Sequence, residues 1–209
     1  MASVAQTQQS YDQTNLPRVL RHALQLGVLE AVLVLLFSIA SRFLAGGAEL
    51  AVQSLIVLVG VSAVATLPGI WTRARTIEGI AGAAGIGLGA AVVFLLIDVS
   101  VLQPLGTYTN RWEEIGGGSN WWYHPVWWMV GTFLPWMGSF ALANQTVRGS
   151  GPNPVAVVGI AVVLAVIIGG LAALLGFPGA TFGLGTMAVA VLPAIALTAL
   201  ITGLGGSRQ

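Results

Sequence analysis

Long apolar stretches alternate with short polar or glycine-rich connections along most of the chain. A helix needs about 20 mainly apolar residues to cross the hydrocarbon core of a bilayer. Six segments meet this requirement, and they cover residues 20–43, 49–71, 80–105, 121–145, 155–177 and 184–204. The pattern therefore predicts an all-α fold: a polytopic integral membrane protein built as a bundle of six transmembrane helices.

The connections between these segments are too short to form a second domain. We expect a flexible polar cytoplasmic tail over residues 1–17, a single transmembrane domain over residues 18–205 and a short cytoplasmic tail over residues 206–209. Residues 1–17 are polar and rich in Gln, and they lack the basic start and short apolar core of a cleavable signal peptide.

The arginines are distributed unequally between the two sides of the predicted spans. Six of the eight fall on the side that holds both termini, and they are Arg18, Arg21, Arg73, Arg75, Arg148 and Arg208. Arg42 and Arg111 fall on the other side. Because cytoplasmic loops of membrane proteins carry the excess of positive charge, both termini are predicted to be cytoplasmic. We expect the protein in a bacterial cytoplasmic (inner) membrane.

Composition excludes several kinds of chemistry. Only 7% of the 209 residues are charged, and the chain has no Cys and no Lys. Covalent haem, iron–sulfur clusters and a retinal Schiff base therefore cannot form on this chain. The net charge of +1 provides no basic field for nucleic acid. Non-covalent contact with a quinone or a pigment stays open.

Two carboxylates lie inside predicted spans, Glu30 near the middle of the first and Asp98 in the outer half of the third. Carboxylates in the membrane are energetically costly and often functional. Each shares a helix face with small residues, which indicates that it points into protein. The functional interpretation is a proton or cation path or a ligand contact. The structural interpretation is a neutral acid bonded to a neighbouring helix, or contact with another subunit. For Glu30 the functional and structural interpretations are balanced. For Asp98 the structural interpretation is favoured, because this residue lies near the outer surface, where we expect it to contact water.

The start of the fourth span is unusually aromatic. Its aromatic and His positions are Trp121, Trp122, Tyr123, His124, Trp127 and Trp128. Trp and Tyr collect at membrane interfaces, so an interfacial belt is the simpler interpretation. The functional interpretation is a platform for a partner subunit or for a quinone or pigment ring.

Small residues spaced four apart predict where helices pack closely. The third span carries Gly85 and Gly89, and the fifth carries the stripe of Ala161, Ala165, Gly169 and Ala173. We expect these positions to face neighbouring helices.

Neither a catalytic constellation nor a metal site is evident in the sequence, and the chain is not expected to be an enzyme. The favoured hypothesis is a non-catalytic membrane subunit of a larger multi-subunit complex, bioenergetic in kind (electron-transfer or photosynthetic). Its partners would be the lipid bilayer and other membrane subunits, with no nucleic acid. The alternative is a small transporter or channel subunit with Glu30 and Asp98 in a proton, ion or solute path.

Overall fold

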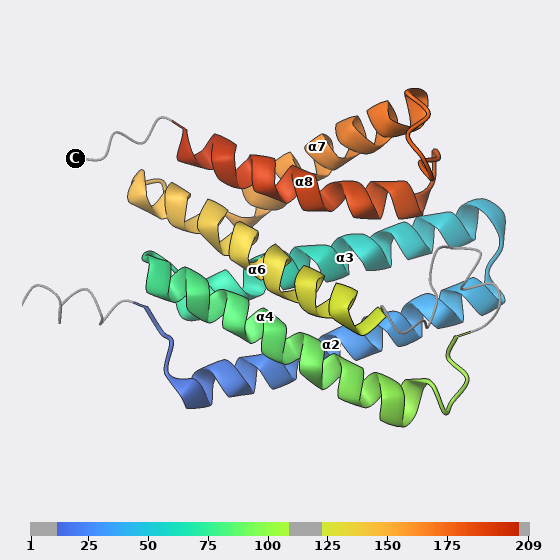
Figure 1. Cartoon of the computed structure of the whole chain (residues 1–209), viewed down its shortest axis with the longest axis horizontal. Helices are drawn as coiled ribbons and strands as arrows, with labels where there is room; N and C mark the ends of the chain where they lie inside the picture. Colours follow the sequence, from blue (N-terminus) through green and yellow to red (C-terminus); the bar gives the residue numbers. More distant parts are fainter. Residues whose placement is uncertain (1–11, 109–122, 205–209) are drawn as a thin grey trace, which may run out of the picture.

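The structure is a computed structural model, and it describes residues 12–108 and 123–204. Within this part the chain is helical, with no strand, and six helices are long and apolar enough to cross a membrane. They are α2 (Leu16–Phe43), α3 (Gly46–Thr72), α4 (Ile77–Ile97), α6 (Tyr123–Val147), α7 (Pro154–Leu174) and α8 (Leu184–Gly203) (Figure 1). A π-helical turn, η1 (Asp98–Leu102), extends α4. The predicted number of helices is confirmed.

Two of the helices begin with the same local signal. Asn15 and Asn153 precede α2 and α7, and each is followed within the first two helical positions by a Pro. The Asn15 side chain accepts a hydrogen bond from the Arg18 backbone N–H at 3.1 Å, and Asn153 accepts one from Ala156 at 3.0 Å. Asn is among the preferred N-cap residues, and Pro fits the first turn because its missing N–H is not needed there.

Helices α2, α3, α4 and α6 form the main bundle, in which α4 packs on α2 and α6, and α6 also packs on α3. Helices α7 and α8 form a hairpin that joins this bundle mainly through α8 and α6 (Figure 1). One apolar core runs through these contacts, with Leu26, Ile86, Leu134 and Ile195 almost completely buried in it.

Glycines lie where the helices of the main bundle cross. A Cβ atom added to Gly138 of α6 would lie 1.9 Å from the Ala65 carbonyl oxygen of α3. A Cβ on Gly87 of α4 would lie 2.0 Å from the Gly131 carbonyl oxygen of α6. Since the obstacle in both cases is backbone, a larger residue cannot be accommodated by a side-chain rotation. These crossings depend on the absence of a side chain.

The small residues predicted to pack differ in their surroundings. Gly89 lies against Ala23, whose Cβ would be 2.8 Å from a Cβ at position 89. Gly85 is exposed and has no atom within 4 Å of such a Cβ, contrary to the prediction. Gly85 and Gly89 lie one turn apart on the same face of α4, and they differ because α2 comes close to α4 beside Gly89 but not beside Gly85.

In the α7–α8 hairpin, most of the predicted stripe faces α8. Ala161, Ala165 and Gly169 are buried, and Ala165 packs with Ala190 and Ala194 of α8. Ala173, the last member of the predicted stripe, is only partly buried.

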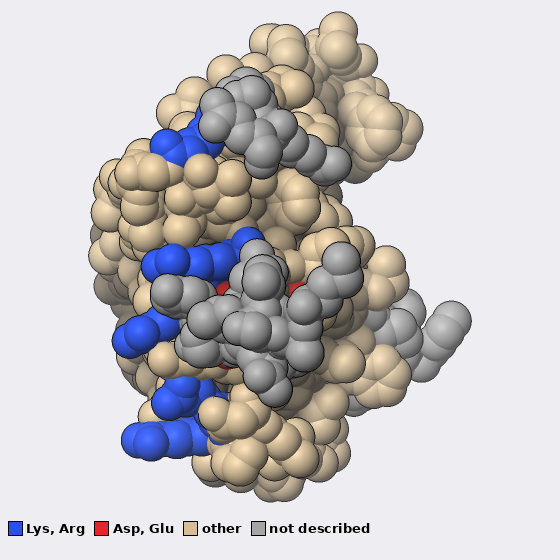
Figure 2. Space-filling model, turned by 90° about the vertical axis from the view of Figure 1, so that its left-hand side faces the viewer, with Lys and Arg blue, Asp and Glu red and all other residues tan. Residues whose placement is uncertain are grey.

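The arginines gather at the end of the bundle where α2 begins and α8 ends. The members of this group in the described part of the chain are Arg18, Arg21, Arg73, Arg75 and Arg148. The first and last described segments both lie at this end (Figure 1), and Figure 2 shows Arg side chains along it. Arg42 lies at the opposite end, where α2 ends.

Candidate functional site

Glu30 lies near the middle of α2 and is 6% exposed. Its Oε2 atom is buried and has no hydrogen-bond partner among the described residues, a condition that it shares with Thr107 Oγ1 and Ser139 Oγ. One turn earlier, Gly27 lies tightly against Ala90 and Val93 of α4. The carboxyl group is therefore inside the protein, and it is the one acidic group with such an unpartnered atom in the described part of the chain.

Asp98 is completely buried and is the first residue of η1. Its carboxylate accepts hydrogen bonds from Gln103 Nε2 at 2.7 Å and from Tyr108 Oη at 2.5 Å. The expected contact with water is therefore wrong. Two neutral donors from the segment that follows Asp98 take the place of water, which is how a buried carboxylate is normally accommodated.

The same segment is held against the end of α2. Ser38 Oγ donates a hydrogen bond to the Thr107 carbonyl oxygen at 2.5 Å, and the Arg42 guanidinium donates to the carbonyl oxygens of Gly106 and Thr107. Gly106 has a φ of +63°, a conformation that Gly adopts at little cost. Asp98, Ser38 and Arg42 thus belong to one structural cluster at this end of the bundle. No local sequence pattern indicates this cluster, because the partners are up to 69 residues apart.

The two carboxylates predicted as candidates do not form a joint site in the structure. Asp98 is hydrogen-bonded to the segment that follows it, whereas Glu30 lies on another helix and its Oε2 has no hydrogen-bond partner among the described residues. In the described residues, no group of three or more His, Asp or Glu side chains could hold a metal ion.

The aromatic platform is only partly described. Trp121 and Trp122 lie outside the described residues, and of Tyr123 and His124 only the backbone, at the start of α6, is described. Trp127 contacts Phe94 of α4, with ring centroids 4.6 Å apart. Trp128 is 46% exposed. At least one member of the predicted platform therefore packs inward on the bundle.

Asp12 was not selected from the sequence, yet it makes four hydrogen bonds. Its carboxylate accepts from the backbone N–H groups of Arg75 at 3.0 Å, Thr76 at 3.3 Å and Gly79 at 3.2 Å, and from the Thr76 hydroxyl. The Gln13 N–H also donates to the Thr72 carbonyl at 2.8 Å. Residues 12–15 of the predicted tail therefore attach to the turn between α3 and α4.

This attachment replaces a local cap. Thr76 precedes α4 but makes no side-chain capping bond, and Asp12 instead supplies the acceptor for the free Gly79 N–H in the first turn of that helix. A Cβ on Gly79 would lie 2.7 Å from the Asp12 carboxyl carbon, so the close approach requires Gly there. Gly79 is the sequence feature that could have indicated a close contact here, but a glycine does not identify the residue that approaches it.

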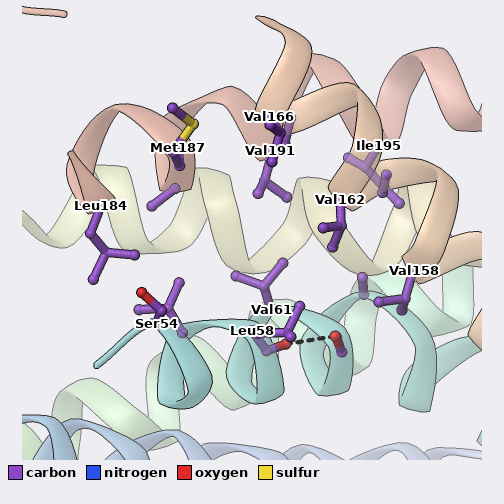
Figure 3. A pocket seen from close by; sticks show the side chains of 16 residues that line it. Ser54, Leu58, Val61, Val158, Val162, Val166, Leu184, Met187, Val191 and Ile195 are labelled. Atoms are coloured by element: carbon purple, nitrogen blue, oxygen red, sulfur yellow. Dashed lines mark hydrogen bonds between the residues drawn. The ribbon is translucent and has the colours of Figure 1, made fainter. Parts of the chain in front are cut away.

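An apolar groove runs between α3 and the α7–α8 hairpin (Figure 3). Its walls are formed by Val, Leu, Ile, Ala and Met side chains, together with the hydroxyl-bearing Ser54 and Ser62. The Ser62 hydroxyl donates to the Leu58 carbonyl of its own helix at 2.6 Å. The groove therefore offers almost no polar group to a ligand.

Comparison with family models, with curated proteins and with solved structures finds no match to this chain.

Proposed function

We propose that the chain is an integral protein of a bacterial cytoplasmic membrane with both termini in the cytoplasm. Six apolar helices of sufficient length and the grouping of five arginines at the end where α2 begins and α8 ends support this proposal. Within that membrane, we propose that it serves as a non-catalytic subunit of a larger complex. The aromatic start of α6 favours a bioenergetic complex, since such rings can contact a quinone, a pigment or a partner subunit.

The observation that carries the subunit proposal is the structural use of the scarce polar side chains. Asp98 is bonded to Gln103 and Tyr108, and Asp12 caps α4. Arg42 and Arg148 donate to backbone carbonyls of Gly106 and Leu204. These groups hold the fold together and are not arranged around a common substrate position.

Every long helix exposes large apolar side chains. Such a surface suits lipid and the apolar faces of other membrane subunits, because helices associate in a bilayer through close packing. A protein of this kind would work through its neighbours.

Co-purification from the native membrane tests this proposal. The tagged protein, extracted in a mild detergent, should elute with larger membrane proteins in fixed stoichiometry. A monodisperse free monomer under the same conditions would contradict it. The visible absorption spectrum of the isolated material tests the bioenergetic part, since haem, flavin or pigment bands are expected from such a complex and their absence would refute that part.

Glu30 favours a second candidate function, a small transporter or channel subunit. A buried carboxyl group with an unpartnered oxygen can bind a proton or a cation in transit. In that case Glu30→Gln should abolish the uptake of protons or cations into reconstituted vesicles. The matched control is Glu78→Gln, because Glu78 is exposed in the first turn of α4. Unchanged uptake in Glu30→Gln would exclude this role.

A further inference from the structure

The groove between α3 and the α7–α8 hairpin is concave and lies alongside helices proposed to be in the membrane. Figure 3 shows Val162, Val166 and Ile195 on one side of it and Leu58 and Val61 on the other. Seen from one end of the molecule, a hollow opens on one side next to the part that holds the hairpin (Figure 2). The hairpin joins the bundle through α6 and contacts α3 only slightly, so the two walls of the groove stay apart.

The length of the groove matches half a bilayer. Its lining extends along α3 from Ser54 to Ala65 and along α8 from Leu184 to Ile195. At the rise of a helix, either distance is about 16 Å. The hydrocarbon core of a membrane is about 30 Å thick, so each leaflet contributes about 15 Å. A chain that entered beside Leu184, where α8 begins, would reach the region of the bilayer centre beside Ile195.

The width of the groove selects the kind of occupant. The space not filled by protein is about 660 Å³, including the part open to the surroundings. Over a length of about 16 Å, this corresponds to a mean cross-section of about 40 Å². A transmembrane helix with its side chains is about 10–12 Å across, a cross-section of about 80–110 Å², so the groove cannot enclose one. A single hydrocarbon chain does fit, because carbon atoms in contact lie only about 3.5–4.0 Å apart.

We infer that this groove binds one acyl chain of a membrane phospholipid. Phospholipid is favoured over an isoprenoid chain by mass action, since it is the bulk component around the protein. The lining of the groove is consistent with an acyl chain, because such a chain forms no hydrogen bonds and the groove presents almost no polar group that would need one. This inference depends on the membrane insertion proposed above, but not on the presence of partner subunits.

Adjacent valines of α7 provide a matched pair of variants. Val162 lines the groove, whereas Val163 is 59% exposed and does not line it. Val162→Phe places a ring in the groove, and Val163→Phe adds the same ring outside it. Displacing two methylene groups of a bound chain reduces affinity by about tenfold.

Native mass spectrometry of the purified chain, released from detergent micelles, measures the bound lipid. The expected result is one phospholipid per chain for the wild type and for Val163→Phe, with bound lipid reduced by about tenfold for Val162→Phe. Equal retention in all three proteins would overturn the inference, as would a wild type without bound lipid. A bound mass that belongs to an isoprenoid quinone would overturn the assignment to an acyl chain.

A second measurement does not depend on the variants folding. The wild type is reconstituted in phosphatidylcholine vesicles that contain a phosphatidylcholine with a photoreactive diazirine midway along one acyl chain. Peptides that carry Val61 and Val162 should be labelled much more strongly than peptides from the exposed faces of α2. Uniform labelling would refute the inference. Resistance to extraction with alkaline carbonate reports membrane insertion separately, and co-purification reports the proposed complex.

Discussion

Asp12 offers the most specific test of how this fold is held together. Asp12→Ala removes the acceptor for three backbone N–H groups and one hydroxyl at the start of α4, without touching the helix itself. The perturbed interaction joins segments 63–67 residues apart, so its loss should release residues 12–15 from the α3–α4 turn.

The magnitude follows from the kind of bonds that are lost. Removing an N-cap acceptor costs about 0.5–2 kcal/mol, and a hydrogen bond to a charged group contributes about 1.5–3 kcal/mol. Asp12 is only partly buried, so water replaces some of these bonds in the variant. We expect a loss of about 2 kcal/mol in the stability of this attachment, which corresponds to about a 30-fold increase in local opening.

Hydrogen–deuterium exchange of the detergent-solubilised protein measures this opening. Amides of residues 75–80 should exchange about 30-fold faster in Asp12→Ala, while amides in the middle of α4 keep their wild-type rate. The control is Glu78→Gln, which removes a negative charge from the same first turn but keeps an acceptor for the Thr14 hydroxyl. Equal acceleration by both variants would show that charge near the helix terminus, and not capping, is responsible. Unchanged exchange in Asp12→Ala would refute the attachment itself.

Three further predictions concern positions inside the bundle. Gly138→Ala should lower the melting temperature in detergent, because the added Cβ meets the α3 backbone and overpacking costs about 1–3 kcal/mol. Gly85→Ala should not lower the melting temperature, because the space around position 85 is open. Tyr108→Phe should destabilise the protein by about 1–2 kcal/mol, because it removes the hydrogen bond to the buried Asp98. In a double-mutant cycle with Asp98→Asn, the coupling energy measured by denaturation should be well above zero. Additive effects of the two substitutions would contradict this contact. Glu30→Leu should raise the melting temperature, because it removes a buried polar atom without a partner, and a clear fall would show that the carboxyl group is bonded.

Helix positions were largely predictable from the sequence. The six predicted spans overlap the six observed helices, and the first and last of them differ from α2 and α8 by at most four residues at either end. The π-helical turn was not predictable, because the expected span 80–105 reads as one continuous apolar segment. Its formation depends on the bond between the Gln103 N–H and the Asp98 carbonyl and on the partners of the Asp98 carboxylate.

The candidate site was predictable only in part. The small residues beside Glu30 and Asp98 correctly indicated that both carboxyl groups point into protein. The sequence could not show that Asp98 has two bonded donors while Glu30 Oε2 has no partner in the described chain, since polarity along one helix does not reveal what the next helix presents. The groove was equally hidden, because its walls come from three helices that are each uniformly apolar.

The sequence by itself determined the number of long helices and the end at which the arginines gather. Both are properties of continuous stretches, since about 20 apolar residues suffice for a span whatever surrounds them. The tertiary structure decided that Gly87 and Gly138 meet a neighbouring backbone while Gly85 does not, and that Asp12 caps a helix far along the chain. These outcomes depend on the rotation and approach of whole helices, which many weak contacts between distant residues set together.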